Sequence, residues 1–141
     1  MIKTYRGRLA DGGQQTIRLS TNKGLIGYRI KKLNLIDAAP GTTSPELIVK
    51  VYKYKQGTVD GAVNFSDETL IAVGYYASYA TGGANTALII FDNVTFNQDI
   101  YVTAFDVAGS AEINYYLELE QIELDLSEAT VATLKDMRGT N

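Results

Sequence analysis

Short segments of alternating apolar and polar residues recur along most of the chain, with turn-forming residues between them. An alternation with a period of two is typical of a β-strand that buries one face. The clearest case spans residues 112–125, where Tyr115, Leu117 and Leu119 point one way and the polar residues between them point the other. The strands predicted in this way cover residues 2–9, 14–20, 25–37, 46–55, 69–79, 86–92, 99–106 and 112–125.

The alternation changes phase within the third predicted strand. Tyr28 and Ile30 share one face, whereas Leu33 and Leu35 share the other. Because a slip of one residue exchanges the two faces of a strand, we expect a β-bulge or a bend near residues 31–32. A bend of this kind is typical of a strand that passes from one sheet to another.

The fourth predicted strand, residues 46–55, alternates without a change of phase. Its apolar positions, among them Leu47 and Val49, are expected inside the fold. Lys50 and Tyr52 fall on the opposite side of the same strand. We therefore expect these two side chains outside the core.

The pattern changes from strand to helix near the C-terminus. Residues 127–138 predict one short helix, with Ser127 as its N-cap and with Leu126 and Val131 forming a hydrophobic staple. Thr130 stands where a complete capping box has Glu or Gln, so the predicted cap is incomplete. A helix this short is marginal by itself, so we expect it to dock on the rest of the molecule.

Together these elements predict an all-β protein, a jelly-roll-like antiparallel β-sandwich of about eight strands with a short C-terminal helix. We expect a single domain, with the sandwich over residues 1–126 and the helix and tail docked on it over residues 127–141. Residues 69–91 carry no charge and are long enough to cross a bilayer, but polar residues and a Gly-Gly pair interrupt them. We therefore expect two strands and a turn there, and no membrane partner.

The 13 basic and 16 acidic residues give a net charge of −3, but they are separated along the chain. Residues 1–55 hold 11 basic and 3 acidic residues, and residues 56–141 hold 2 basic and 13 acidic ones. Either early and late strands lie side by side and neutralise each other, or the surface is basic on one side and acidic on the other and steers docking. An isoelectric point of about 4.9 argues against a specific nucleic-acid partner.

The sequence contains no cysteine and no histidine. It therefore has no disulfide, no zinc–thiolate site and no imidazole base. Glu118 and Glu120 share one strand face, but this spacing does not place a sugar between them as a glycosidase requires. Oxygen-bearing side chains of the kind that bind calcium occur in the predicted loops without a calcium-loop motif: Asp60, Asp67, Glu68, Asp92, Asn93 and Asp99. We expect no enzyme activity, no cofactor and no metal site.

The sequence contains ten tyrosines and no tryptophan. Tyr75, Tyr76 and Tyr79 cluster in one predicted strand. Tyrosine suits both cores and interfaces because it joins an apolar ring to a polar tip. A row of exposed tyrosines can also bind sugar, although such platforms usually include tryptophan.

The last third of the chain carries a pattern of strand and helix residues that stands out from the rest. It comprises residues 97–103, Asp106, residues 114–121 and, in the predicted helix, Glu128, Val131, residues 133–135 and Arg138. Over roughly residues 94–138, this pattern resembles small structural proteins of the head-decoration, or cement, kind that marine tailed bacteriophages encode.

The resemblance implies a virion component on the capsid exterior that binds subunits of the major capsid protein and stabilises the shell. It also implies a symmetric homo-oligomer, with a trimer favoured. We expect the contacts to come from the helix at 127–138 and from loops at 38–45 and 56–67. The predicted interaction residues are Ser127, Val131, Leu134, Lys135, Arg138, Tyr75, Tyr76 and Tyr79.

Two other classes of function share the predicted sandwich. One is a tail or fibre module that binds a host receptor or a carbohydrate. The other is a glycosidase or lyase that uses Glu118. Glycan binding by the isolated protein would favour the first, and turnover that is lost on Glu118→Gln would favour the second.

Overall fold

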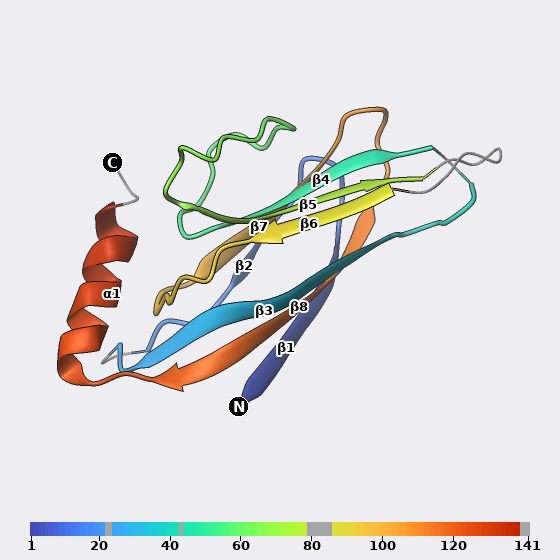
Figure 1. Ribbon diagram of the computed structural model, residues 1–141. Helices are drawn as coiled ribbons and strands as arrows, with labels where there is room; N and C mark the ends of the chain where they lie inside the picture. Colours follow the sequence, from blue (N-terminus) through green and yellow to red (C-terminus); the bar gives the residue numbers. More distant parts are fainter. Residues whose placement is uncertain (22–23, 43, 79–85, 139–141) are drawn as a thin grey trace.

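The computed structural model describes residues 1–21, 24–42, 44–78 and 86–138 of the 141-residue chain. Within these ranges the chain forms eight strands and one helix in the predicted order (Figure 1). The strands are β1 (Ile2–Leu9), β2 (Gln14–Ile17), β3 (Ile26–Asp37), β4 (Glu46–Tyr52), β5 (Leu70–Ala77), β6 (Thr86–Phe91), β7 (Ile100–Asp106) and β8 (Ile113–Glu123), and the helix is α1 (Leu126–Arg138).

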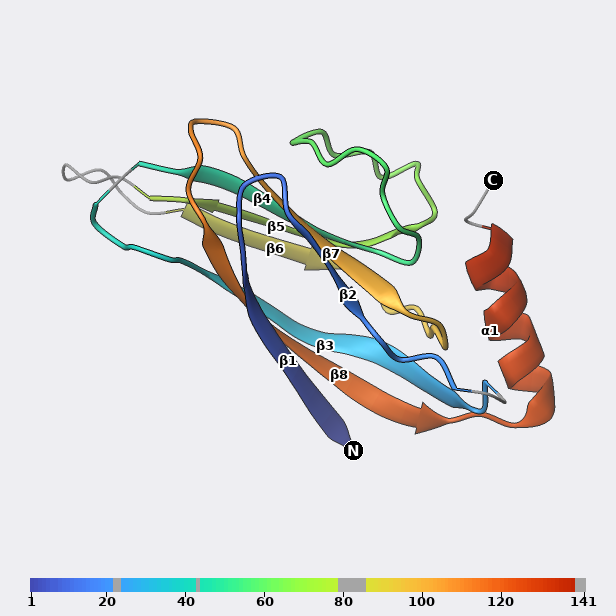
Figure 2. The ribbon, with the colours of Figure 1, turned by 180° about the vertical axis from the view of Figure 1, so that it is seen from behind.

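The strands form two antiparallel sheets that pack face to face, so the predicted all-β sandwich is confirmed. Sheet A has the strand order β1-β8-β3, and sheet B has the order β2-β7-β4-β5-β6. Figures 1 and 2 show the two layers from opposite sides, with α1 at one end. In a regular jelly roll the sixth strand extends the sheet of the first, eighth and third strands. Here β6 pairs with β5 instead, along its whole length.

The sandwich core consists of the apolar residues that the alternation pattern places inside. Tyr115, Leu117 and Leu119 of β8 point into it from sheet A, and Leu47 and Val49 of β4 point into it from sheet B. All five belong to one buried cluster that spans both sheets. Removing this apolar surface from water is the main term that stabilises the fold.

The predicted irregularity in β3 is present as a register shift between Ile30 and Lys32. Ile30 lies opposite Leu119 and Leu33 lies opposite Leu117, so residues on both sides of the shift face the core. Of the two possibilities, a bulge and a bend between sheets, the structure has the bulge, because β3 pairs with β8 from end to end. One extra residue in the strand is enough to restore its inward face without a change of sheet.

The acidic strand β8 lies between the basic strands β1 and β3 (Figure 2). Arg8 pairs with Glu112, just before β8, and both Arg29 and Lys31 pair with Glu120. The hydrogen bonds from Arg29 and Lys31 lower the pKa of the Glu120 carboxyl. At these pairs, the charge separation along the sequence is neutralised by early and late strands that lie side by side.

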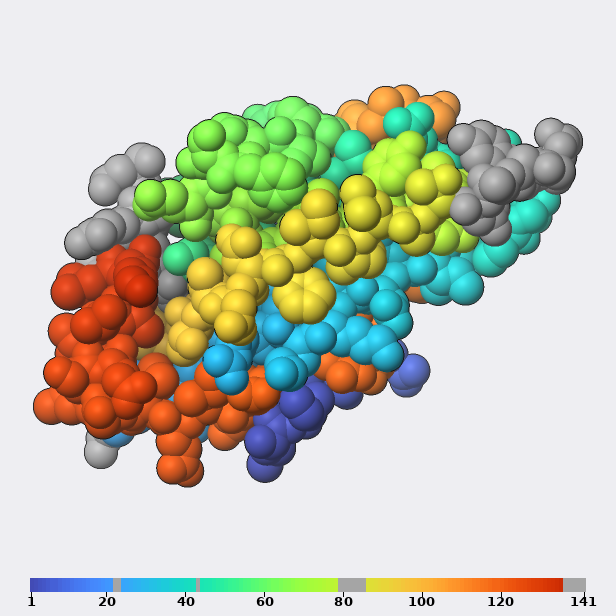
Figure 3. Space-filling model, viewed as in Figure 1, coloured from blue at the N-terminus to red at the C-terminus, as the bar shows by residue number. Residues whose placement is uncertain are grey.

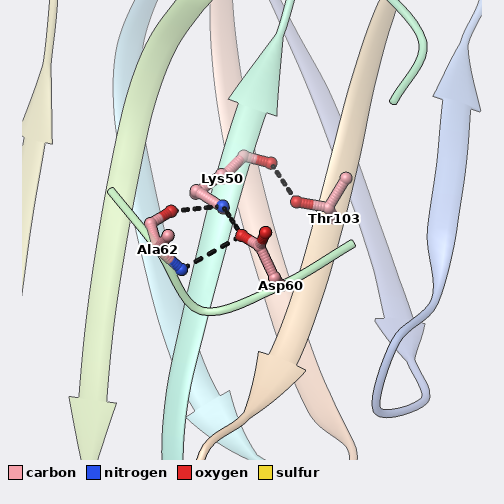
Figure 4. A network of polar contacts seen from close by, with 4 residues as sticks. All are labelled: Lys50, Asp60, Ala62 and Thr103. Atoms are coloured by element: carbon pink, nitrogen blue, oxygen red, sulfur yellow. Dashed lines mark hydrogen bonds and ion pairs between the residues drawn. The ribbon is translucent and has the colours of Figure 1, made fainter. Parts of the chain in front are cut away.

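Residues 53–69, here called the strap, cross the outer face of sheet B. Tyr52 and Lys50 lie on that face as predicted. Both are buried, so the expectation that they lie outside the core is wrong, and Lys50 is only 3% exposed. Its Nζ donates to Asp60 Oδ1 at 3.2 Å and to the carbonyl of Ala62 at 2.5 Å (Figure 4). The physical reason is that the strap supplies an ion-pair partner and a carbonyl to a lysine that it removes from water.

Candidate functional site

Helix α1 stands at one end of the sandwich and carries most of the predicted interaction residues (Figures 1 and 3). The N–H of Glu128 donates to Asp125 Oδ1 at 2.7 Å, and the N–H of Asp125 donates to Glu128 Oε1 at 3.3 Å. The prediction of an incomplete box with Ser127 as N-cap is therefore wrong. Asp125 is the N-cap of a complete capping box, because starting there satisfies two backbone donors at once. The hydrogen bond from Glu128 also lowers the pKa of Asp125.

The inner side of α1 is held by a small apolar cluster. Leu124, just before the helix, packs with Ala129 and Ala132. With Asp125 as N-cap, Leu124 and Ala129 occupy the positions of a hydrophobic staple. The predicted staple of Leu126 and Val131 is wrong, since both side chains are exposed.

Asn97 joins the helix to the sandwich. Its side chain is fully buried, and its Nδ2 lies 2.8 Å from Thr133 Oγ1, 3.3 Å from the carbonyl of Ala129 and 3.1 Å from the carbonyl of Gly24. A side chain at Gly24, whose φ is +64°, would approach that same amide to 3.0 Å. In the sequence, Asn97 stands out only as part of the resemblance, because no local pattern indicates that a polar residue beside a strand anchors a distant helix.

Helix α1 also carries apolar side chains that remain in water. Leu126 is 76% exposed, Val131 is 52% exposed and Leu134 is 54% exposed. Val131 and Leu134 are three residues apart, so they are neighbours on one side of the helix. An apolar surface on a firmly anchored element is typical of a protein-binding site.

A groove of about 720 Å³ runs between α1 and the sandwich. Ser127, Val131 and Lys135 line it from the helix, and Arg29 and Glu120 line it from sheet A. The groove therefore places an apolar side chain next to charged groups of both signs. Three of the predicted interaction residues lie in this one place.

The remaining predicted interaction residues do not join them. Leu134 is exposed on the helix, and the side chain of Arg138 lies outside the described part of the structure, as does the whole of Tyr79. Tyr75 and Tyr76 lie on opposite faces of β5. Tyr75 packs against the small apolar cluster on the outer face of sheet B, and Tyr76 packs against the sandwich core. The end of β5 that carries them is also remote from α1 (Figures 1 and 2).

A second hollow, of about 620 Å³, lies on sheet A. Its side chains form two rows of cross-strand neighbours: Arg6, Tyr116 and Asn34, and then Arg8, Asn114 and Ile36. Guanidinium and amide groups offer hydrogen-bond donors to an anionic or hydroxylated ligand.

Glu118 and Glu120, the carboxylates considered for glycosidase chemistry, serve as hydrogen-bond acceptors within sheet A. Glu118 accepts from the hydroxyl of Tyr116 at 2.9 Å, which raises the pKa of that phenol. Glu120 accepts from Arg29 and Lys31, and its pKa is lowered. A catalytic acid requires the opposite shift.

Three of the residues considered for calcium, Asp60, Asp67 and Asp99, accept hydrogen bonds from backbone N–H groups. Asp99 Oδ1 accepts from the N–H groups of Leu19 and Ser20 at 2.8 Å and 2.9 Å. Burial alone would raise the pKa of Asp99, but these hydrogen bonds lower it. In the described ranges, no three acidic residues are arranged to hold a metal ion. Within the same ranges, no helix has the length and apolar character needed to span a bilayer.

Comparisons with known proteins do not assign the chain to a family. No protein-family model matches the sequence, and no curated protein matches it. The function therefore has to be inferred from the surfaces of the molecule itself.

Proposed function

We propose that this chain is a structural virion protein without enzyme activity, a capsid decoration or cement protein. In this role it lies on the capsid exterior, where it binds the outer surface of the major capsid shell and stabilises it. The observation that carries the proposal is the apolar surface of α1, where Val131 and Leu134 are each more than half exposed. The resemblance of residues 94–138 to head-decoration proteins supports the same function.

The way in which α1 is attached suits a helix that docks on a partner. The capping box of Asp125 and Glu128 and the buried amide of Asn97 hold it before any partner arrives. A surface that is already ordered loses little conformational entropy on binding, so more of the contact energy appears as affinity.

The surroundings of Val131 resemble the anatomy of an interface. In the groove, Arg29 and Lys135 contribute positive charge and Glu120 contributes negative charge around this apolar side chain. Apolar centres with polar rims are common in protein–protein interfaces, and the rim charges guide the docking orientation.

The test uses capsids assembled without this chain, to which purified protein is added. We expect Val131→Glu/Leu134→Glu to weaken binding at least tenfold, because a capsid contact would have to bury the new charges. Co-sedimentation and particle maps measure the occupancy. The matched control is Ile36→Glu/Val107→Glu, which introduces the same charges at positions that are 55% and 53% exposed away from α1.

The control variant should bind as the unmodified protein does, and circular dichroism should show both variants folded. Unchanged capsid occupancy of the helix variant, or a protein that never binds the shell, would overturn the proposal.

The hollow on sheet A favours a second candidate, a tail or fibre module that binds a host carbohydrate. Arg6, Asn34, Asn114 and Tyr116 would make the contacts. Glycan binding by the isolated protein that is lost in Arg6→Ala/Asn114→Ala would assign the chain to this class. The decoration function predicts no such binding.

A further inference from the structure

Strand β6 is the outermost strand of sheet B, and one of its edges pairs with no other strand in the part of the chain that the structure describes. Figure 3 shows it (yellow) as a band at the surface between the strap (green) and β3 (blue). Among the described strands, the other edge strands have features that disfavour pairing with another chain. β1 and β3 carry several basic residues, and β2 is only four residues long. Natural proteins protect their edges in this way against pairing. β6, from Thr86 to Phe91, has no charged residue.

Large apolar side chains of β6 remain in water. Leu88 is 56% exposed, Ile90 is 43% exposed and Phe91 is 38% exposed. Leu88 and Ile90 lie on the outer side of the sheet, whereas Ile89 turns inward and packs against the sandwich core. An uncharged edge with exposed apolar residues is the kind of strand that takes up another strand.

The backbone shows which residues of β6 are available to such a strand. The N–H of Asp92 donates to the carbonyl of Ile71 across the β5–β6 pair. Because the direction of these groups alternates along an antiparallel strand, the even-numbered residues of β6 bond to β5. Ala87, Ile89 and Phe91 therefore direct their N–H and C=O groups to the open edge.

We propose that β6 pairs with β6 of a second copy of this chain, antiparallel, about a two-fold axis at Ile89. In this register Ile89 lies opposite Ile89 of the second copy, and Ala87 lies opposite Phe91. All the available backbone groups of these three residues then find partners in the other chain. The two copies of sheet B become one continuous sheet.

The side chains favour a second copy as the occupant because this register is self-complementary. The opposed pairs would be Ala87 with Phe91, Leu88 with Ile90 and Thr86 with Asp92. A small side chain meets a large one, two exposed aliphatic side chains cover each other, and a hydroxyl meets a carboxylate. The same patch serves both partners, as a two-fold interface requires.

The inference goes beyond the proposed function and does not depend on it. A two-fold contact closes with two copies, so we expect a dimer in solution rather than the trimer that the family resemblance implies. The contact residues lie on β6, whereas the capsid test changes residues of α1. Either proposal can fail while the other holds.

Charge substitutions at the exposed pair test the register. Leu88→Lys/Ile90→Lys places like charges opposite each other across the dimer, whereas Leu88→Lys/Ile90→Glu places opposite charges there. Sedimentation velocity up to about 100 μM should show a dimer for the unmodified chain and for the Lys/Glu variant. The dissociation constant of the Lys/Lys variant should rise at least 100-fold. A mass of one or three copies for the unmodified chain, or equal behaviour of the two variants, would overturn the proposal.

Hydrogen exchange supplies a second readout that does not depend on substitutions. As the protein concentration rises, the amides of Ala87, Ile89 and Phe91 should become protected. Those of Leu88 and Ile90, which bond to β5, should not change. Concentration-dependent protection of the even-numbered amides, or of none, would contradict the proposed register.

Discussion

At the scale of single residues, Lys50 shows how a charged side chain determines the position of a long segment. Its ammonium group reaches Asp60 and the carbonyl of Ala62 in the strap and lies 5.6 Å from the centre of the Tyr52 ring. Asp60 itself remains 58% exposed, so removing the lysine does not leave a buried carboxylate without a partner. The lysine therefore contributes mainly by fixing the strap on sheet B.

We expect Lys50→Met, which keeps most of the apolar stem, to lower the free energy of unfolding by about 1–3 kcal/mol through the lost charged hydrogen bonds. The Ala62 amide, which donates to Asp60, should exchange faster because the strap loosens. Urea unfolding and hydrogen exchange measure the two effects. Lys55→Met, at an exposed position in the same strap, is the control. Equal effects of both substitutions would contradict this role for Lys50.

The sequence could predict the face on which Lys50 lies, but not its burial. Alternation along β4 reports the two sides of a strand, whereas burial depends on a separate segment that folds across it. Asn97 presents the same difficulty, since its partners Gly24 and Thr133 are far away in the sequence. The sequence pattern could predict the helix that carries Val131 and Leu134, but not the residue that anchors this helix.

At the scale of elements, α1 differs from its prediction by where it begins. Both Asp125 and Ser127 are residue types that cap helices, and only Asp125 has Glu three positions later. Choosing Asp125 also replaces an exposed staple with the buried pair of Leu124 and Ala129. Because the helix starts two residues earlier than predicted, its packed staple residue is Ala129 and not Val131. The side chain of Val131 therefore remains exposed to water.

We expect Asp125→Ala to fray the first turn of α1, because the N–H of Glu128 loses its acceptor. Ser127→Ala should leave the helix intact. Circular dichroism at 222 nm and the exchange rates of the Glu128 and Ala129 amides compare the two. A larger effect for Ser127→Ala would contradict the assignment of the cap.

The strands themselves were the most predictable elements, because a period of two is visible in any half-buried strand. Their neighbours were less predictable. The phase change at Ile30 correctly indicated a bulge, yet it could not tell a bulge from a change of sheet. In the same way, the two strands and the turn expected over residues 69–91 left open whether β6 pairs with β5 or extends sheet A.

At the scale of the whole molecule, several carboxyl groups have a lower pKa in the folded state than in the unfolded chain. The hydrogen bond from Lys50 lowers the pKa of Asp60, and that from Arg29 lowers the pKa of Glu120. For Asp99, backbone hydrogen bonds outweigh burial and lower the pKa. The unfolded chain therefore binds more protons than the folded one in acid.

We expect the free energy of unfolding to stay nearly constant from about pH 5 to pH 8, since the sequence has no histidine. It should fall as the pH drops below the ordinary carboxyl values of 3.8 for Asp and 4.5 for Glu and through the lowered values in the folded state. Urea unfolding across this range checks the sign, and Asp60→Asn should weaken the acid dependence. A protein that becomes more stable in acid would contradict this account.

The pairing of β1 and β3 with β8 also has a consequence for synthesis, because β8, the strand at the centre of sheet A, leaves the ribosome after both of its neighbours. Until residue 113 and those after it emerge, β1 and β3 have no strand to lie between them, and the apolar sides of both stay uncovered. Formation of this sheet has to wait until β8 has been synthesised, because pairing between segments far apart in the sequence can begin only when both are present. A messenger truncated before that point would yield a product that chaperones hold and proteases remove.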